Sequence, residues 1–342
     1  MQERTQRRAL VLASLVLATM LALLGNLWLE TGTVKAADPT TYSNPVIQTN
    51  FPDPDVIQAN GQYYVYATNG NNENIQIARS ADLINWTQLP DALPTVGSWA
   101  KGGLGLTWAP GVIQIGDQYN MYYVSRDIQS DKQCVGVATS ASPEGPFKDT
   151  NDHAFVCQAD QGGTIDPSAF YDGNTLYLYF KNDGNCCSLP VHLYVQQLSS
   201  DGLNLVGNPT SLVQNDQQWE GNLVEAPYMF KHNDKYYLFF SANNYADGSY
   251  ATGYALCQSA TGPCQQAAEN PILSSDSKQT PPLIGPGGET LIQVGDQTWM
   301  LYHEWNVNAD GSQGDARYMA VDKVNWPDDK PVVAVNGATP AN

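Results

Sequence analysis

The chain has 342 residues, of which 42% are hydrophobic and only 15% are charged, and its formal net charge is −18. The apolar fraction is large enough to bury a core, which excludes general disorder. The acidic balance excludes the clustered basic surface that binds nucleic acid or anionic lipid. With 29 glycines, 21 prolines and 19 tyrosines, the composition favours short strands and turns over long helices.

The N-terminal segment predicts export. Residues 1–37 combine three arginines, an apolar run over residues 9–24 and small residues around Ala36, which is the pattern of a signal peptide. The alternative is an uncleaved signal anchor, because Leu27-Trp28-Leu29 prolongs the apolar stretch. We therefore expect a secreted protein whose single domain occupies residues 38–342, with no other membrane-spanning segment.

Export makes disulfide bonds possible for the six cysteines. The pairs that proximity in the sequence favours are Cys134–Cys157 and Cys257–Cys264. Cys186 and Cys187 then form either a vicinal disulfide or two free thiols. No CxxC motif occurs and the four histidines are scattered, so no zinc site is expected.

Five segments of similar sequence dominate the rest of the chain. In chain order they read PDPDVIQANGQYYVYAT from Pro52, WAPGVIQIGDQYNMYYV from Trp108, IDPSAFYDGNTLYLYFK from Ile165, EAPYMFKHNDKYYLFFS from Glu225 and GGETLIQVGDQTWMLYH from Gly287. Each has a short apolar group, a turn of the Asn-Gly or Gly-Asp type and a strand rich in Tyr, Phe and Leu, which predicts a β-hairpin. Further strand-like sequence follows each hairpin, so we expect about four strands per repeat.

Repeated four-stranded sheets in tandem predict an all-β fold, a five-bladed β-propeller in a single domain. A β-sandwich is the alternative, since it also has short strands and frequent turns. It gives no reason, however, for the repeated prolines to lie 56, 57 and 60 residues apart. The propeller is therefore the preferred fold.

The repeat also aligns the residues that open each hairpin. Because the first strand of every blade lines the central channel, these openings meet at one end of it. The residues in register before the repeated proline are Asp53, Ala109, Asp166, Ala226 and Gly288. Glu225 stands one position earlier in the fourth repeat, so Asp53, Asp166 and Glu225 fall at matching edges of three blades.

These carboxyl groups are either solvated turn residues or members of one site. Their apolar neighbours indicate partial burial, which is costly for an unused charge. Converging carboxyls suit acid–base hydrolysis of glycosidic bonds, in which one protonates the leaving oxygen and another activates water. A third negative charge separates the two roles by disfavouring ionisation of the acid. The competitors are Asp55 for the base and Glu220 for the acid.

The motifs that carry these residues resemble glycoside hydrolase family 43. They are NPV with FPDPDVI, TWAP, GGTIDPSAF, WEG with VEAPYMF, and LYHEW, and they span about residues 43–335. The resemblance implies a five-bladed propeller enzyme that acts with inversion on polysaccharides containing arabinose or xylose. It also implies that Asp53 is the general base, that Asp166 tunes and orients the acid, and that Glu225 is the general acid.

Three further residues are candidates for substrate binding. Trp108 opens the second blade at the channel mouth and is expected to stack on a sugar, the alternative being a core aromatic. Arg317 resembles a family arginine that points into the pocket, with a plain surface position as the alternative. His303 lies on an inner strand of the fifth blade, either as a ligand or as a structural histidine.

Two departures from the family pattern concern the channel. Many members have a histidine in a Gly-Pro-Gly-His segment associated with an ion, but residues 285–288 read GPGG here, which argues against a structural calcium. Gly111 follows TWAP where an aspartate is common. We expect no required cofactor and no metal.

The resemblance also narrows the expected activity. Xylosidases of the family commonly carry an added C-terminal β-sandwich, and this sequence ends after the fifth repeat, so we expect a monomeric α-L-arabinofuranosidase. An endo-arabinanase or β-xylosidase is the alternative, and residues 182–190 and 243–249 are candidate loops for closing one end of a cleft. A non-catalytic carbohydrate-binding propeller is opposed by the three acids. A fructan-cleaving propeller is opposed by the sequences Pro52-Asp53-Pro54-Asp55 and Glu225-Ala226.

Overall fold

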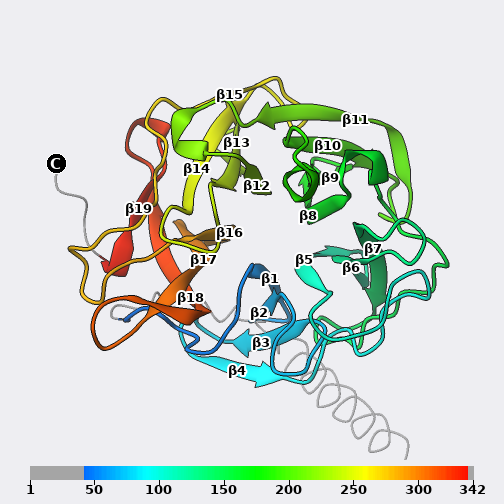
Figure 1. Cartoon of the computed structure of the whole chain (residues 1–342), viewed down its shortest axis with the longest axis horizontal. Helices are drawn as coiled ribbons and strands as arrows, with labels where there is room; N and C mark the ends of the chain where they lie inside the picture. Colours follow the sequence, from blue (N-terminus) through cyan, green and yellow to red (C-terminus); the bar gives the residue numbers. More distant parts are fainter. Residues whose placement is uncertain (1–41, 338–342) are drawn as a thin grey trace, which may run out of the picture. The chain divides into compact units, whose positions relative to one another are not determined.

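The computed structural model describes residues 42–337, so the predicted export signal and the boundary after residue 37 lie outside the described residues. Within this range five antiparallel sheets follow one another around a central axis (Figure 1). The predicted five-bladed β-propeller is therefore confirmed. No helix of the described part is long and apolar enough to cross a membrane.

The strands run outward in chain order in every blade. Blade 1 contains β1 (Asp55–Ala59), β2 (Gln62–Ala67), β3 (Gln76–Ser80) and β4 (Trp86–Leu89). Blade 2 contains β5 (Trp108–Ile115), β6 (Gln118–Arg126) and β7 (Gln133–Ser140). Blade 3 contains β8 (Thr164–Asp172), β9 (Thr175–Asn182), β10 (His192–Leu198) and β11 (Leu205–Gln214). Blade 4 contains β12 (Val224–His232), β13 (Lys235–Ala242), β14 (Ala251–Cys257) and β15 (Cys264–Gln266).

Blade 5 contains β16 (Gly287–Val294), β17 (Gln297–Val307), β18 (Gln313–Asn325) and β19 (Val332–Ala334). Short 3₁₀ helices occur in the connections and near the C-terminal end: η1 (Ala159–Gln161), η2 (Gly184–Cys187), η3 (Gln218–Glu220), η4 (Pro327–Asp329) and η5 (Val335–Gly337). The inner two strands of each blade are the predicted hairpins. In the first, Asn60 and Gly61 both have positive φ, 52° and 72°, as the tight turn between paired strands requires.

Blade 2 departs from the expected four strands. The segment that covers its outer edge, residues 148–156, forms isolated bridges to β7, Thr139 with Lys148 and Val135 with Val156, in place of a continuous strand. The sequence before it contains Pro143 and Pro146, which lack the N–H groups that a continuous strand ladder needs. The outer position is thus occupied without a regular strand.

The hydrophobic core is divided into five clusters, one between each pair of adjacent blades. The second strand of a blade feeds two of them, because successive side chains point to opposite faces of a sheet. In β2, Tyr64 and Tyr66 pack toward blade 2, whereas Tyr63 and Val65 pack toward blade 5. This explains why these strands are apolar throughout instead of alternating with polar residues.

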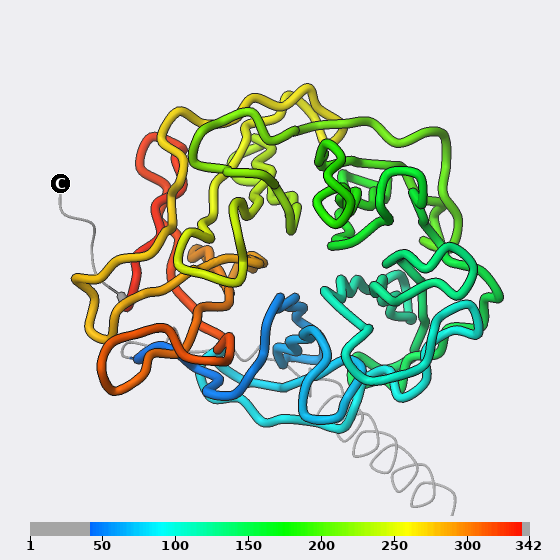
Figure 2. Tube along the Cα trace, in the orientation of Figure 1, coloured from blue at the N-terminus to red at the C-terminus, as the bar shows by residue number. Residues whose placement is uncertain are grey.

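The N-terminal segment before blade 1 completes blade 5. The backbone N–H of Val46 donates to the Met319 carbonyl at 2.8 Å, and that of Phe51 donates to the Arg317 carbonyl at 2.8 Å. Figure 2 shows this first segment, in blue, alongside the orange strands of blade 5. The ring is therefore closed by hydrogen bonds between the two ends of the propeller.

A layer of contacts around the channel joins every blade to the next. The residues in register are Asp55, Gly111, Ser168, Tyr228 and Thr290. The Asp55 carboxylate accepts a hydrogen bond from the Val112 N–H at 2.7 Å and one from the Thr290 hydroxyl at 3.4 Å. The Ser168 hydroxyl donates to the Pro227 carbonyl, and the Tyr228 hydroxyl donates to the Leu291 carbonyl at 2.9 Å.

Between blades 2 and 3 the contact is instead a close approach of the two backbones, at Gly111 and Pro167. A Cβ atom at Gly111 would lie 2.2 Å from the Pro167 carbonyl oxygen. Only glycine fits there without moving a blade, which explains why this chain lacks a larger residue after TWAP.

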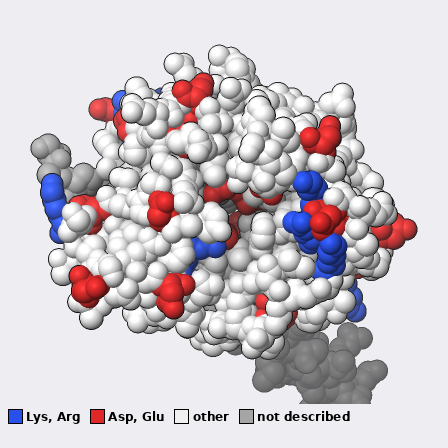
Figure 3. Space-filling view, viewed as in Figure 1, with Lys and Arg blue, Asp and Glu red and all other residues white. Residues whose placement is uncertain are grey.

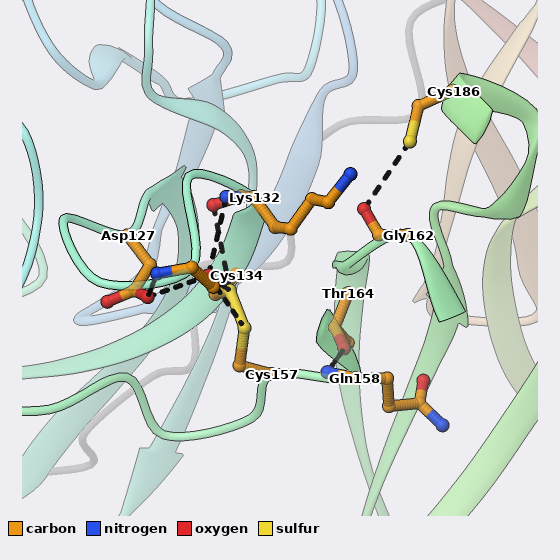
Figure 4. The surroundings of a disulfide bond; sticks show 9 residues. Asp127, Lys132, Cys134, Cys157, Gln158, Gly162, Thr164 and Cys186 are labelled. Carbon is orange, nitrogen blue, oxygen red and sulfur yellow. Dashed lines mark hydrogen bonds between the residues drawn. A yellow bond between two sulfur atoms is a disulfide. The ribbon is translucent and has the colours of Figure 1, made fainter. Parts of the chain in front are cut away.

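Three disulfides are formed, Cys134–Cys157, Cys186–Cys187 and Cys257–Cys264. Of the two possibilities for Cys186 and Cys187, the structure has the vicinal disulfide and not two free thiols. The first disulfide joins β7 to the connection that leads to blade 3, next to Asp127 and Lys132 (Figure 4). Lys132 reaches across to blade 3, where its ammonium donates to the Cys187 Sγ at 3.1 Å.

Candidate active site

The residues aligned by the repeat share an unusual backbone conformation. Their φ angles are 55° at Asp53, 36° at Ala109, 55° at Asp166, 52° at Ala226 and 61° at Gly288. Non-glycine residues rarely adopt positive φ, and each such position costs about 1–3 kcal/mol. In four of the five blades a β-bulge in the inner strand includes this position. Bulges re-aim side chains, so these strands turn their opening residues toward one another at the channel mouth.

A pocket of about 590 Å³ lies at this end of the channel. Its volume falls within the range of small-molecule sites. Figure 3 shows acidic atoms in the central hollow and basic atoms at its edge. The pocket brings together five of the six predicted site residues: Asp53, Trp108, Asp166, Glu225 and Arg317.

Two neighbouring groups hold the Asp53 carboxylate. The Thr68 hydroxyl donates to Oδ2 at 2.5 Å, and the Arg317 guanidinium donates to Oδ1 at 3.1 Å. The Thr68 oxygen in turn accepts the Ala109 N–H at 2.9 Å, which directs its own hydrogen toward Asp53. Arg317 therefore faces the pocket and pairs with the predicted base, while Thr68 was not recognised from the sequence.

His303 does not line the pocket. It is completely buried, its ring stacks on Tyr250 with centroids 5.6 Å apart, and its Nδ1 accepts the Asp53 N–H at 3.2 Å. Burial, aided by the charge of Arg317, holds the pKa of His303 well below its usual range. The imidazole is therefore neutral and supports the backbone of Asp53, so the sequence expectation of direct substrate binding is replaced by a supporting position.

Asp166 lies beside Glu225 at the edges of blades 3 and 4. Its Oδ2 accepts the Ala226 N–H at 2.9 Å. Burial, and next the negative charge of Glu225, raise the pKa of Asp166 to about 7, although Lys181 opposes the shift. The raised pKa allows the Asp166 carboxyl to hold a proton near neutral pH.

Glu225 is paired with a lysine that the sequence reasoning missed. Its Oε2 is 2.8 Å from the ammonium of Lys181, a side chain with no exposed surface. Burial alone would lower the pKa of Lys181, but the charges of Glu225 and Asp166 outweigh it and raise the pKa. A signal was present, because Lys181 interrupts the apolar strand LYLYF, and a lysine at an interior position requires a carboxylate partner.

The two competing acids occupy structural positions. Asp55 is 8% exposed, both its oxygens are engaged between blades, and burial raises its pKa to about 7. Glu220 is completely buried and caps η3, where its Oε2 accepts the N–H groups of Asp216 and Gln217 at 2.7 and 2.8 Å. Asp55 lines the same pocket, but the contacts of its two oxygens hold it between the blades, and Glu220 does not line the pocket.

Aromatic and polar side chains border the pocket. Trp108 is partly exposed and is fixed by a hydrogen bond from its indole N–H to the Gly105 carbonyl at 3.1 Å. Tyr245, which was not recognised from the sequence, is 48% exposed and lies under the Arg317 guanidinium at 5.0 Å. Asn185 and Cys186 also line the pocket, so both of the loops that were candidates for closing the cleft border it.

The residues of the channel do not fit an ion held by an imidazole at position 288. A Cβ atom at Gly288 would lie 2.7 Å from the His303 ring, and the Nδ1 of that ring is already used by Asp53. Elsewhere in the described chain, a group with metal-binding spacing consists of Asp127, Cys134 and Cys157. Its two sulfurs form a disulfide and are not available as thiolates.

Fold and pocket together define the class, a propeller glycosidase with carboxyl groups at one mouth of its channel. The chain belongs to glycosyl hydrolases family 43, whose sequence model matches residues 42–331.

Individual relatives differ in the activity that their names state. A probable arabinan endo-1,5-α-L-arabinosidase C of Aspergillus niger is 28% identical, over 82% of this chain and 91% of the relative. A β-D-galactofuranosidase of the same species is 27% identical, over 87% of this chain and 86% of the relative. The crystal structure of a thermostable family-43 glycoside hydrolase is 31% identical with a TM-score of 0.77, covering 88% of this chain and 98% of the other.

Proposed function

We propose that this protein is a secreted glycosidase that cleaves α-L-arabinofuranosyl linkages of plant polysaccharides with inversion. The observation that carries the proposal is the convergence of Asp53, Asp166 and Glu225 from three blades on one pocket. Secretion is supported by the predicted signal segment and by the three disulfides, which persist in oxidising compartments.

In the proposed mechanism Glu225 donates its proton to the leaving glycosidic oxygen. Asp53 takes a proton from the water that attacks the anomeric carbon from the opposite face. The hydrogen bonds from Thr68 and Arg317 orient the Asp53 carboxylate for this task. Asp166 lies beside Glu225, where it is proposed to tune and orient the acid, and burial together with the charge of Glu225 raises its own pKa to about 7.

Inversion is tested by the anomer formed first. Proton NMR during early hydrolysis of an α-linked arabino-oligosaccharide should show the β-anomer of arabinose, which then mutarotates. Initial release of the α-anomer would contradict the mechanism. Inversion also predicts that the Asp53 and Glu225 carboxyls lie roughly 6.5–9.5 Å apart, which leaves room for the water.

The role of Glu225 is tested by Glu225→Gln. The variant should lose at least about 100-fold in kcat on arabino-oligosaccharides, because general acid catalysis contributes 10²–10⁴-fold. Binding of arabinose-containing ligands, measured by calorimetry, should remain close to that of the unaltered protein. Near-normal turnover would remove Glu225 from the acid role.

Exo action is the first candidate, because Cys186 and Tyr245 belong to two different loops that border the pocket. Endo-arabinanase action is the second candidate, and it is favoured by the similarity to the Aspergillus niger endo-1,5-arabinosidase. The product profile on debranched arabinan separates them. Arabinose alone from the first minutes supports exo action, whereas a ladder of oligosaccharides supports endo action.

A further inference from the structure

The pairing of Lys181 with Glu225 is unusual for a glycosidase acid. An ammonium beside a carboxyl group favours the ionised form, yet a general acid has to start protonated. Lys181 comes from β9, opposite Ile165 of β8 and Leu193 of β10, and its side chain has no exposed surface. It touches Glu225 Oε2 but does not line the pocket, so it cannot act on a substrate directly.

We propose that Lys181 is the positioning residue of the acid: its ammonium anchors Oε2 of Glu225 and so keeps the transferable proton on Oε1. This inference rests on the proposed function of Glu225. A proton on Oε2 would lie against the hydrogens of the Lys181 ammonium, which donates to that oxygen. A proton on Oε1 would not meet the ammonium. The carboxyl group therefore presents one defined oxygen to the leaving group, and it does not rotate between two.

Several charged groups surround Glu225 and Lys181. The titratable groups that face this carboxyl or its lysine are Asp166 of β8, Lys181 of β9, Asp183 after β9, Tyr250 before β14 and Glu289 of β16. Within this set of the described chain, Lys181 is the single cation. Its ammonium therefore faces two adjacent carboxyl groups, and it contacts that of Glu225 directly.

Lys181 also acts after the proton has left. As the glycosidic oxygen is protonated, Glu225 becomes an anion in a buried setting, where an uncompensated charge is costly. The ammonium already lies 2.8 Å away and requires no rearrangement to stabilise that charge. Its effect should therefore appear in kcat and in the pH profile, while KM changes little.

The test is Lys181→Met, an unbranched apolar replacement, with Lys235→Met as the matched control. Lys235 is also a strand lysine, but its side chain is 48% exposed and pairs with Asp329 at the outer surface. Two substrates are compared: an arabino-oligosaccharide, whose poor leaving group needs the acid, and 2,4-dinitrophenyl α-L-arabinofuranoside, whose leaving group does not. Measurements of kcat and KM over pH 4–9 are made for all variants, after circular dichroism has shown that each is folded.

For Lys181→Met we expect kcat on the oligosaccharide to fall by roughly 10- to 100-fold, with KM within about threefold and the dinitrophenyl substrate largely spared. The alkaline limb of its pH profile should move up by roughly 1 unit, because losing the cation favours the protonated acid. Lys235→Met should change neither substrate. Equal losses on both substrates with an unshifted alkaline limb, or unchanged kinetics, would overturn the inference.

Glu225→Gln measured in the same assays separates this inference from the proposed function. If Glu225→Gln retains turnover, the proposed function fails; if it is inactive while Lys181→Met behaves like the unaltered protein, only the role of Lys181 fails. Should Lys181→Met not fold, Lys181→Arg carries the test. It keeps the cation, so its alkaline limb should stay in place, and an upward shift in this variant would overturn the inference.

Discussion

Substitution of Gly111 by alanine tests whether the blades are in contact around the channel as the structure has them. The new Cβ atom would lie 2.2 Å from the Pro167 carbonyl oxygen, 3.1 Å from its carbon and 3.2 Å from the Ser168 Cα. All three are backbone atoms, so no side-chain rotation relieves the overlap. Blades 2 and 3 would have to separate by about 1 Å to restore ordinary contact.

The cost of that separation follows from the packing on either side. Overpacking a well-filled interior typically costs about 1–3 kcal/mol. The displaced Pro167 and Ser168 belong to the inner strand of blade 3 that begins next to Asp166. The same shift would therefore disturb the site, and we expect a loss of activity together with the loss of stability.

Urea unfolding followed by tryptophan fluorescence measures the effect. For Gly111→Ala the midpoint should fall while the slope stays unchanged, which reports lower stability without a change in the surface exposed on unfolding. Gly102→Ala is the matched control, because no atom lies within 4 Å of a Cβ atom at this exposed position. A Gly111→Ala protein as stable as Gly102→Ala would refute the close approach of blades 2 and 3.

Two other substitutions test the electrostatics of the fold and of the site. Burial raises the pKa of Asp55 and Glu289 to about 7 and that of Glu304 to about 8, so the folded protein holds protons that the unfolded chain has released. The free energy of unfolding should therefore fall as the pH rises from about 4 to about 8, and Glu304→Gln should make this decline shallower in urea titrations at pH 5 and pH 8; an unchanged slope would contradict the assignment. Thr68→Val removes the hydroxyl between Asp53 and the Ala109 N–H and should lower kcat about tenfold or more, since hydrogen bonds to charged groups contribute about 1.5–3 kcal/mol. Unaltered kcat in steady-state assays on arabino-oligosaccharides would mean that Thr68 does not orient the proposed base.

The repeat made the architecture and much of the pocket predictable. Aligning five openings identified the positions of Asp53 and Asp166, and the same register has positive φ in every blade. The alignment worked because blades are equivalent units around one axis, so equal positions in the sequence become neighbours in space. The same reasoning predicted that Trp108 would face the pocket, whereas Arg317 was expected there from the resemblance to the family.

The repeat did not predict contacts that occur in one blade and have no counterpart in the others. Thr68 directly follows the second strand of blade 1, and Lys181 lies near the end of the second strand of blade 3, but their roles depend on a partner contributed by another segment or another blade. His303 was placed in the pocket because its strand is an inner one, yet its side chain fits behind Asp53, where the absence of a side chain at Gly288 leaves room. The predicted fourth strand of blade 2 is absent, because the segment after Pro143 and Pro146 bonds to β7 only at isolated positions, a local feature that an average repeat does not represent.

The pairing of the first described residues with β18 has a consequence for biosynthesis. The Asn44 side chain donates to the Val321 carbonyl, a partner 277 positions later in the chain. A ribosome makes this segment first, and it stays without its partner until nearly all of the polypeptide has emerged. Such distant contacts slow folding, so the earlier sheets have to remain soluble while the ring is still open.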